Sequence, residues 1–257
     1  MNQVNQVSQV NIDRPNIKLS PIIGALVLAW AGAVSEVAWA QTAAEPPAQH
    51  QHMGGHAGHA GSGEGFHRRF DDAEKWAKEF DNPERDAWQK PEEVLDALHL
   101  QPTSLVADIG AGTGYFSVRI AKRVPEGKIF AADVEPDMVR YLGARAEREQ
   151  LANLTPVLAR TDTANLPEPV DLILVVDTYH HIDDRTRYFA ALQSSLRPGV
   201  RLVIIDFKAD SPNGPPAKHR ISPERVGEEL AAAGYMLIEK FEFLPRQYGL
   251  IFRKRDS

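Results

Sequence analysis

The most informative segment of this 257-residue chain reads Val106-Ala107-Asp108-Ile109-Gly110-Ala111-Gly112-Thr113-Gly114. The mainly apolar segment 104–109 is typical of a buried strand. After the glycines, a helical pattern runs from Tyr115 to Arg123. Strand, glycine turn and helix in this order bring backbone N–H groups close to a ligand. Glycine tolerates the unusual backbone angles that such an approach needs. The segment therefore predicts a ligand-binding loop at the end of a buried strand.

The sequence on both sides of this loop alternates between strand and helix patterns. A second strand, 127–132, ends in Asp133, whose carboxylate can accept hydrogen bonds from two ribose hydroxyls. The further patterns predict a helix over 136–150, strands over 154–158 and 170–176, a helix over 185–196, a strand over 201–206, and two terminal strands over 236–243 and 248–253. We therefore expect an α/β fold, a Rossmann-like doubly wound sheet that ends in an antiparallel β-hairpin and is preceded by a helical N-terminal segment.

A glycine-rich loop after a strand also occurs in nicotinamide dehydrogenases, whose fingerprint is Gly-x-Gly-x-x-Gly. Here the loop reads Asp-Ile-Gly-Ala-Gly-Thr-Gly. With this loop and the terminal hairpin, residues 92–253 resemble the class I S-adenosylmethionine-dependent methyltransferases, and 106–114 closely match the first motif of that family. The chain has Gly199-Val200 where the family often has two glycines, a departure outside the cofactor motif. The resemblance implies a seven-stranded sheet, S-adenosyl-L-methionine as the cofactor, and methyl transfer as the reaction.

The resemblance also implies which residues contact the cofactor. Asp108 and the glycine backbone would meet its methionine portion and ribose, Asp133 the ribose hydroxyls, and Asp162 the adenine. Met138 would pack near the adenine, and Asp177 would line the methyl-transfer site. The full set of expected cofactor-binding residues is Asp108, Gly110, Ala111, Gly112, Gly114, Asp133, Val134, Met138, Asp162 and Asp177.

Three candidate catalytic residues, Tyr179, His180 and His181, follow the fourth strand. They lie at the carboxyl edge, where ligands bind in open α/β sheets. Methyl transfer from a sulfonium depends mainly on alignment, and a general base is needed when the acceptor is a hydroxyl, an acidic carbon or a protonated amine. One of the two histidines is a candidate for that base. The alternative is that a histidine here hydrogen-bonds the loop and supports the fold.

The composition restricts the possible partners and compartments. The chain is 43% hydrophobic and 25% charged with a net charge of −6, which is ordinary for a globular domain with additional terminal segments. Because a nucleic-acid-binding surface is usually basic, no nucleic acid partner is expected. The chain contains no cysteine, which excludes thiolate catalysis, disulfides and cysteine-ligated metals and fits an oxidising compartment.

Residues 1–40 are predicted to be a signal peptide. Cations at Arg14 and Lys18 precede an apolar run over 22–34, and Ala38 and Ala40 supply the small residues before an expected cleavage at Gln41. This predicts export, most simply to the periplasm. The alternative is an uncleaved inner-membrane anchor over 22–40, which would be the chain's only membrane contact. The apolar run of 13 residues is, however, shorter than the roughly 20 that a spanning helix needs.

Residues 41–65 are predicted to be a flexible linker, because they are rich in Ala, Pro, Gly and His and lack apolar periodicity. Its histidines, His50, His52, His56 and His59, are possible metal ligands. The alternative, a solvated linker that binds metal only adventitiously, is favoured since a mobile chain imposes no coordination geometry.

Residues 66–91 are predicted to be a helical lid before the methyltransferase domain of residues 92–257. The segment carries Phe70, Trp76, Phe80 and Trp88 among charged residues, with a break at Asp81-Asn82-Pro83. It would cover the cofactor and the acceptor. The alternative is that its aromatic residues only pack on the core.

The expected function is methyl transfer to a small-molecule acceptor in the cell envelope. One alternative is a catalytically silent binding protein with the methyltransferase fold, since the periplasm has no obvious supply of S-adenosylmethionine. Another is an envelope protein that handles a metal or metalloid through the histidine linker. Arsenite is disfavoured as an acceptor because its methyltransferases use cysteine thiolates.

Overall fold

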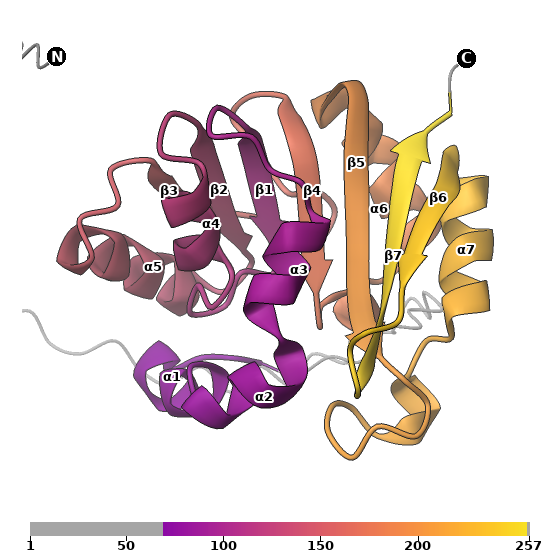
Figure 1. The fold of residues 1–257 in the computed structure, drawn as a ribbon, viewed down its shortest axis with the longest axis horizontal. Coiled ribbons are helices and arrows are strands. Elements are labelled where there is room, and N and C mark those ends of the chain that lie inside the picture. Colours follow the sequence, from indigo (N-terminus) through magenta and orange to yellow (C-terminus); the bar gives the residue numbers. More distant parts are fainter. Residues whose placement is uncertain (1–68, 256–257) are drawn as a thin grey trace, which may run out of the picture. The chain divides into compact units, whose positions relative to one another are not determined.

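The computed structural model describes residues 69–255, and these contain one seven-stranded sheet (Figure 1). Its strand order is β3-β2-β1-β4-β5-β7-β6. The strands are β1 (Leu105–Ile109), β2 (Lys128–Asp133), β3 (Leu154–Leu158), β4 (Val170–Val176), β5 (Leu196–Phe207), β6 (Tyr235–Phe241) and β7 (Gln247–Lys254). The first five strands are parallel, and β7 is antiparallel to both β5 and β6. The α/β fold and its terminal hairpin are therefore confirmed.

Helices cover both faces of this sheet. They are α1 (Ala73–Phe80), α2 (Asp86–Gln89), α3 (Pro91–Ala97), α4 (Ser117–Arg123), α5 (Pro136–Arg148), α6 (Arg185–Leu192) and α7 (Pro223–Ala232), with 3₁₀ turns at Pro83–Arg85, Tyr179–His181, Gln193–Ser195 and Ala217–His219. Alternate residues of β4 enter two separate cores. Leu172 and Leu174 pack with α3, α4 and α5, whereas Ile173 and Val175 pack with α6 and α7. Because β4 is apolar on both faces, helices can cover both sides of the sheet, as they do in a doubly wound fold.

Three elements, β5, α6 and α7, differ clearly from the sequence prediction. Strand β5 begins at Leu196 rather than Arg201, since Leu196 pairs with Val170 across a register irregularity and the strand passes through the Arg197-Pro198-Gly199 turn. The preceding α6 accordingly ends at Leu192. Helix α7 was not predicted, although Ser222 caps its first turn by accepting a hydrogen bond from the backbone N–H of Arg225.

The segment before the domain forms two short helices, α1 and α2, across the end of the sheet at which the parallel strands finish (Figure 1). Trp76 packs with Phe70, Phe80 and Met138, the last of which belongs to α5. The expected break is present, and Asn82 caps the 3₁₀ turn that begins at Pro83. No helix among residues 69–255 is long and apolar enough to cross a membrane. The predicted signal peptide, the histidine linker and residues 66–68 of the predicted lid lie outside the described residues.

Candidate active site

A cavity of about 770 Å³ lies at the carboxyl edge of the sheet, a volume within the usual range for small-molecule sites. Its floor includes the ends of β1, β2, β4 and β5, represented by Asp108, Asp133, Asp177 and Phe207. Residues of α1 and α2 and the turn between them line the opposite side. The parallel topology explains the position, because the carboxyl ends of neighbouring strands meet along one edge.

The glycine loop forms one wall of this cavity. Gly110 and Gly112 have φ angles of 74° and 56°, in the left-handed region that favours glycine. A Cβ atom on Gly110 would lie 2.1 Å from Oγ1 of Thr178, so no other residue fits there without rearrangement. The backbone N–H of Gly110 donates to the carbonyl of Ala132 over 2.8 Å, which ties the loop to the end of β2.

Asp133 lies beside this loop, where the sequence predicts a ribose-binding carboxylate. Its Oδ2 accepts from the N–H of Gly112 over 2.8 Å, and its Oδ1 accepts from the N–H of Glu135 over 2.9 Å. Burial raises the pKa of Asp133, although these backbone donors oppose the shift. Each oxygen retains a further lone-pair direction, so the fixed carboxylate can accept from a ligand hydroxyl.

Asp108 is the second buried acid of the site, with 3% of its surface exposed. Ser117 donates its hydroxyl to Oδ2 over 2.6 Å. Burial raises the pKa of Asp108 to about 6, despite the hydrogen bond from Ser117, and the nearby charge of Asp133 contributes in the same direction. A cationic ligand would offset this cost of holding negative charge in the cavity.

The residues present fit S-adenosylmethionine, which carries an ammonium, a sulfonium, a carboxylate and two ribose hydroxyls. Asp108 and Asp133 offer acceptors for the cationic and hydroxyl groups, respectively. Thr113, which is 1% exposed and lines the cavity, has an Oγ1 with no hydrogen-bond partner among the described residues. Because an unpaired buried hydroxyl is costly, it is a candidate partner for a polar group of the cofactor.

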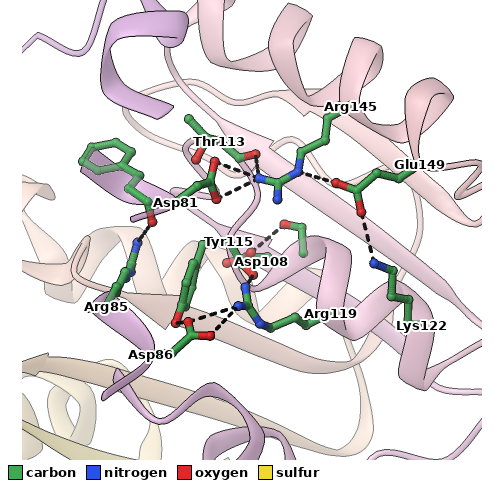
Figure 2. Close-up of polar contacts among 12 residues, drawn as sticks. Asp81, Arg85, Asp86, Asp108, Thr113, Tyr115, Arg119, Lys122, Arg145 and Glu149 are labelled. Carbon is green, nitrogen blue, oxygen red and sulfur yellow. Dashed lines mark hydrogen bonds and ion pairs between the residues drawn. The ribbon is translucent and has the colours of Figure 1, made fainter. Parts of the chain in front are cut away.

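The N-terminal helical segment is fastened to the glycine loop by two polar clusters (Figure 2). Arg145 of α5 donates to the Asp81 carboxylate over 2.8 Å and to the backbone carbonyl of Thr113 over 2.8 Å. Asp86 accepts from the Tyr115 hydroxyl over 2.5 Å and from Arg119 over 3.1 Å. Residues of both the segment and the loop line the cavity, so these contacts fix two of its walls relative to each other.

Asp177 follows the last residue of β4 and lies in a third polar cluster. Arg85 approaches its Oδ2 to 3.5 Å, and Gln247 donates to its Oδ1. Gln89 of α2 donates to Gln247 over 2.6 Å. Burial raises the pKa of Asp177 to about 7, with Arg85 opposing the shift. The cluster connects the N-terminal segment with the end of β4 and the start of β7, beside the cavity.

His180 and Asp206 form a buried pair on the same side. Nδ1 of His180 lies 2.9 Å from Oδ1 of Asp206, which belongs to β5. Burial disfavours the protonated imidazole, but the charge of Asp206 and its hydrogen bond outweigh this effect and raise the pKa of His180. His180 also lines the cavity. With Nδ1 held by Asp206, Nε2 is the nitrogen available for proton exchange with a ligand.

Most of the expected cofactor residues line the cavity, namely Asp108, Gly110, Ala111, Gly112, Asp133, Val134, Met138 and Asp177. Two are placed elsewhere. Gly114 does not line it; a Cβ there would lie 2.8 Å from Leu142, so this glycine permits close packing of α5. Asp162 does not line it either: its side chain is 67% exposed and pairs with Arg160, whereas the neighbouring Arg160 and Thr161 line the cavity.

The three catalytic candidates separate in the structure. His180 and His181 line the cavity, with their rings 4.2 Å apart, and His181 meets Phe70 edge-on at 5.5 Å. Tyr179 is fully buried on the other side of the turn and donates its hydroxyl to Glu229 over 2.7 Å. It does not line the cavity, so we withdraw it as a catalytic candidate and assign it to the core of that face.

Several residues of the site were not identified from the sequence, among them Asp206, Phe207, Arg246 and Gln247. Asp206 ends a predicted strand, a position that could have drawn attention to it. The other three carry no such signal, because their partners are distant in sequence.

Comparison with known proteins supports the resemblance to methyltransferases. Residues 106–199 match a family described as a methyltransferase domain. Malonyl-[acyl-carrier protein] O-methyltransferase 1 of Ilyobacter polytropus is 33% identical over 102 residues, which are 40% of this chain and 37% of that protein. The chain thus spans well under half the length of this curated relative.

Solved structures agree with the sequence match. An S-adenosylmethionine-dependent methyltransferase from Aquifex aeolicus superposes with a TM-score of 0.65 at 28% identity, covering 70% of this chain and 97% of that one. Mitomycin 7-O-methyltransferase shares the fold with a TM-score of 0.59 at 14% identity, over 72% of this chain and 59% of that one. With the glycine loop, sheet order and cavity described above, these matches support a class I S-adenosylmethionine-dependent methyltransferase domain in this chain.

Proposed function

We propose that this methyltransferase transfers the methyl group of S-adenosylmethionine to a small-molecule acceptor in the cell envelope. The observation that carries the proposal is a single cavity whose lining includes both the glycine loop with Asp133 and the His180 side chain held by Asp206. A cofactor site and a proton-accepting group thus open into one space that a small acceptor can share.

The cofactor half of the cavity would bind S-adenosylmethionine and orient it toward the acceptor. S-adenosylmethionine supplies a methyl group that its positive sulfur already activates. Asp133 would hold the ribose hydroxyls, and Asp108 would balance the positive charge of the methionine portion. Phe70, Trp76 and Phe80 form a ring cluster with centroids 5.1–5.7 Å apart on the lid side. Aromatic faces attract cations and exclude water, which would otherwise hydrate the sulfonium.

The acceptor half would remove a proton when the methyl group is received by a hydroxyl. S-adenosylmethionine would supply the methyl group, its carbon–sulfur bond being exchanged for a bond to the acceptor oxygen, and Nε2 of His180 would accept the hydroxyl proton. Asp206 would orient the imidazole through Nδ1 and stabilise its protonated form. The raised pKa of His180 makes this ring a stronger base than an ordinary histidine.

The proposed location depends on the sequence before the domain. The apolar run over 22–34, followed by Ala38 and Ala40, supports cleavage before Gln41 and export. The absence of cysteine from the chain is compatible with an oxidising compartment.

Calorimetric titration of S-adenosylhomocysteine tests the cofactor half, and transfer of labelled methyl from S-adenosylmethionine into small molecules of an envelope extract tests the reaction. Asp133→Ala should weaken binding at least tenfold, because a charged hydrogen bond is worth about 1.5–3 kcal/mol. Asp133→Asn, which keeps one acceptor oxygen, should bind with intermediate affinity, and the exposed Asp96→Ala should bind normally. Equal affinity of the wild type and Asp133→Ala would overturn the assignment.

A further inference from the structure

The acceptor half of the cavity has two aromatic walls. Trp88 of α2 and Phe207 at the end of β5 have ring centroids 6.2 Å apart and are tilted by 36°. The ring centroid of Phe207 also lies 6.3 Å from that of His180. All three residues line the cavity. Flat apolar walls next to the candidate base favour a flat acceptor, because a planar ring makes the largest contact with them.

Arg246 completes this part of the cavity from the loop between β6 and β7. Its guanidinium carbon lies 5.4 Å from the centroid of the Trp88 ring, and its Nη1 donates to Oδ1 of Asn213. Within residues 69–255 no carboxylate lies at ion-pair distance from Arg246. Arg85, the other arginine near Trp88, differs because it approaches the Asp177 carboxylate to 3.5 Å.

This arrangement holds a cation in place while leaving its charge uncompensated. A neutral amide oxygen and an aromatic face fix the guanidinium without neutralising it. The planar guanidinium matches a carboxylate in geometry, since two parallel N–H groups can donate to its two oxygens. An anion at Arg246 would also be attracted by the sulfonium in the same cavity.

We propose that the methyl acceptor is a small planar carboxylate whose carboxylate group binds Arg246 while its ring packs against the cavity wall that Trp88 and Phe207 form. This inference rests on the proposed function and names its substrate class. The ring contacts run in the order Arg246, Trp88, Phe207 and His180. An acceptor anchored at Arg246 and lying along these rings would present its other end, which carries the methyl-accepting hydroxyl, to His180.

Matched probes test the inference. The protein is first saturated with S-adenosylhomocysteine, and 2-naphthoate or its neutral isostere 2-naphthamide is then titrated by calorimetry. The wild type should bind the acid at least tenfold more tightly than the amide. Arg246→Gln should bind both equally weakly, and Arg246→Lys should recover part of the preference, since it keeps the charge without the planar fork. Arg253→Gln, an exposed arginine of β7, is the matched control and should keep the full preference.

The two proposals fail in different ways. If S-adenosylhomocysteine does not bind to the wild type, the proposed function is wrong. If it binds, but the wild type does not distinguish acid from amide, or Arg246→Gln retains the preference, the carboxylate site is wrong. Titration of S-adenosylhomocysteine into each variant confirms that the protein is folded, because Arg246 lies on the acceptor side and its loss should leave that affinity within twofold.

Discussion

Replacing Asp108 by asparagine should stabilise the free protein at alkaline pH while weakening cofactor binding. Folding buries this carboxyl group and moves its pKa from the ordinary 3.8 to about 6. The unfolded chain therefore releases the proton more readily, and stability falls as pH rises from about 4 through 6. Each pKa unit corresponds to about 1.4 kcal/mol, so ionised Asp108 destabilises the fold by about 3 kcal/mol at pH 8.

Urea unfolding of the ligand-free protein at pH 4, 6 and 8 measures this effect. Asp108→Asn removes the charge but keeps an oxygen that can accept from Ser117, so at pH 8 it should gain about 2–3 kcal/mol in the free energy of unfolding. At pH 4 the gain should disappear, because Asp108 is then protonated in the wild type. The exposed Asp96→Asn should show no such dependence on pH. A variant that is less stable than the wild type at pH 8, or that gains equally at pH 4, would refute the reasoning.

Two further predictions concern the lid contact and the N-terminus. Arg145→Met should lower the free energy of unfolding by about 2 kcal/mol and reduce affinity for S-adenosylhomocysteine, because Asp81 and the Thr113 carbonyl lose their shared donor. Urea unfolding measures the first effect and calorimetry the second. The control, Arg148→Met at an exposed position, should behave as the wild type. In fractionated cells, mass spectrometry should find a chain that begins at Gln41 in the envelope fraction, whereas an intact chain in the cytosol would contradict the proposed export.

The sequence predicted those parts of the fold and site whose chemistry is local. The glycine loop and Asp133 are each recognisable within a few residues, and the structure brings them together through hydrogen bonds such as that from Gly112 to Asp133. Strand β4 was equally clear, because the five successive apolar residues of 172–176 are suited to burial on two faces. Local pattern and tertiary environment agree at these positions.

The rest depends on contacts between distant segments. Sequence analysis placed both Tyr179 and His180 among the catalytic candidates, but one turn directs Tyr179 to Glu229 and His180 to Asp206. Neither direction follows from periodicity in a three-residue 3₁₀ turn. Similarly, the uncompensated charge of Arg246 is visible only once its neighbours in space are known.

The walls of the acceptor half come from parts of the chain that lie outside the family match of residues 106–199. Trp88 precedes that region, while Phe207 and Arg246 follow it; the glycine loop and Asp133 lie within it. If the proposed acceptor site is correct, these recognition residues are separable along the polypeptide from the cofactor loop and the candidate base His180, which lie within 106–199. Exchanging the flanking segments between two such enzymes should transfer acceptor preference while S-adenosylmethionine use is retained, so the helices before β1 and the loops after β5 are the positions to vary in redesign.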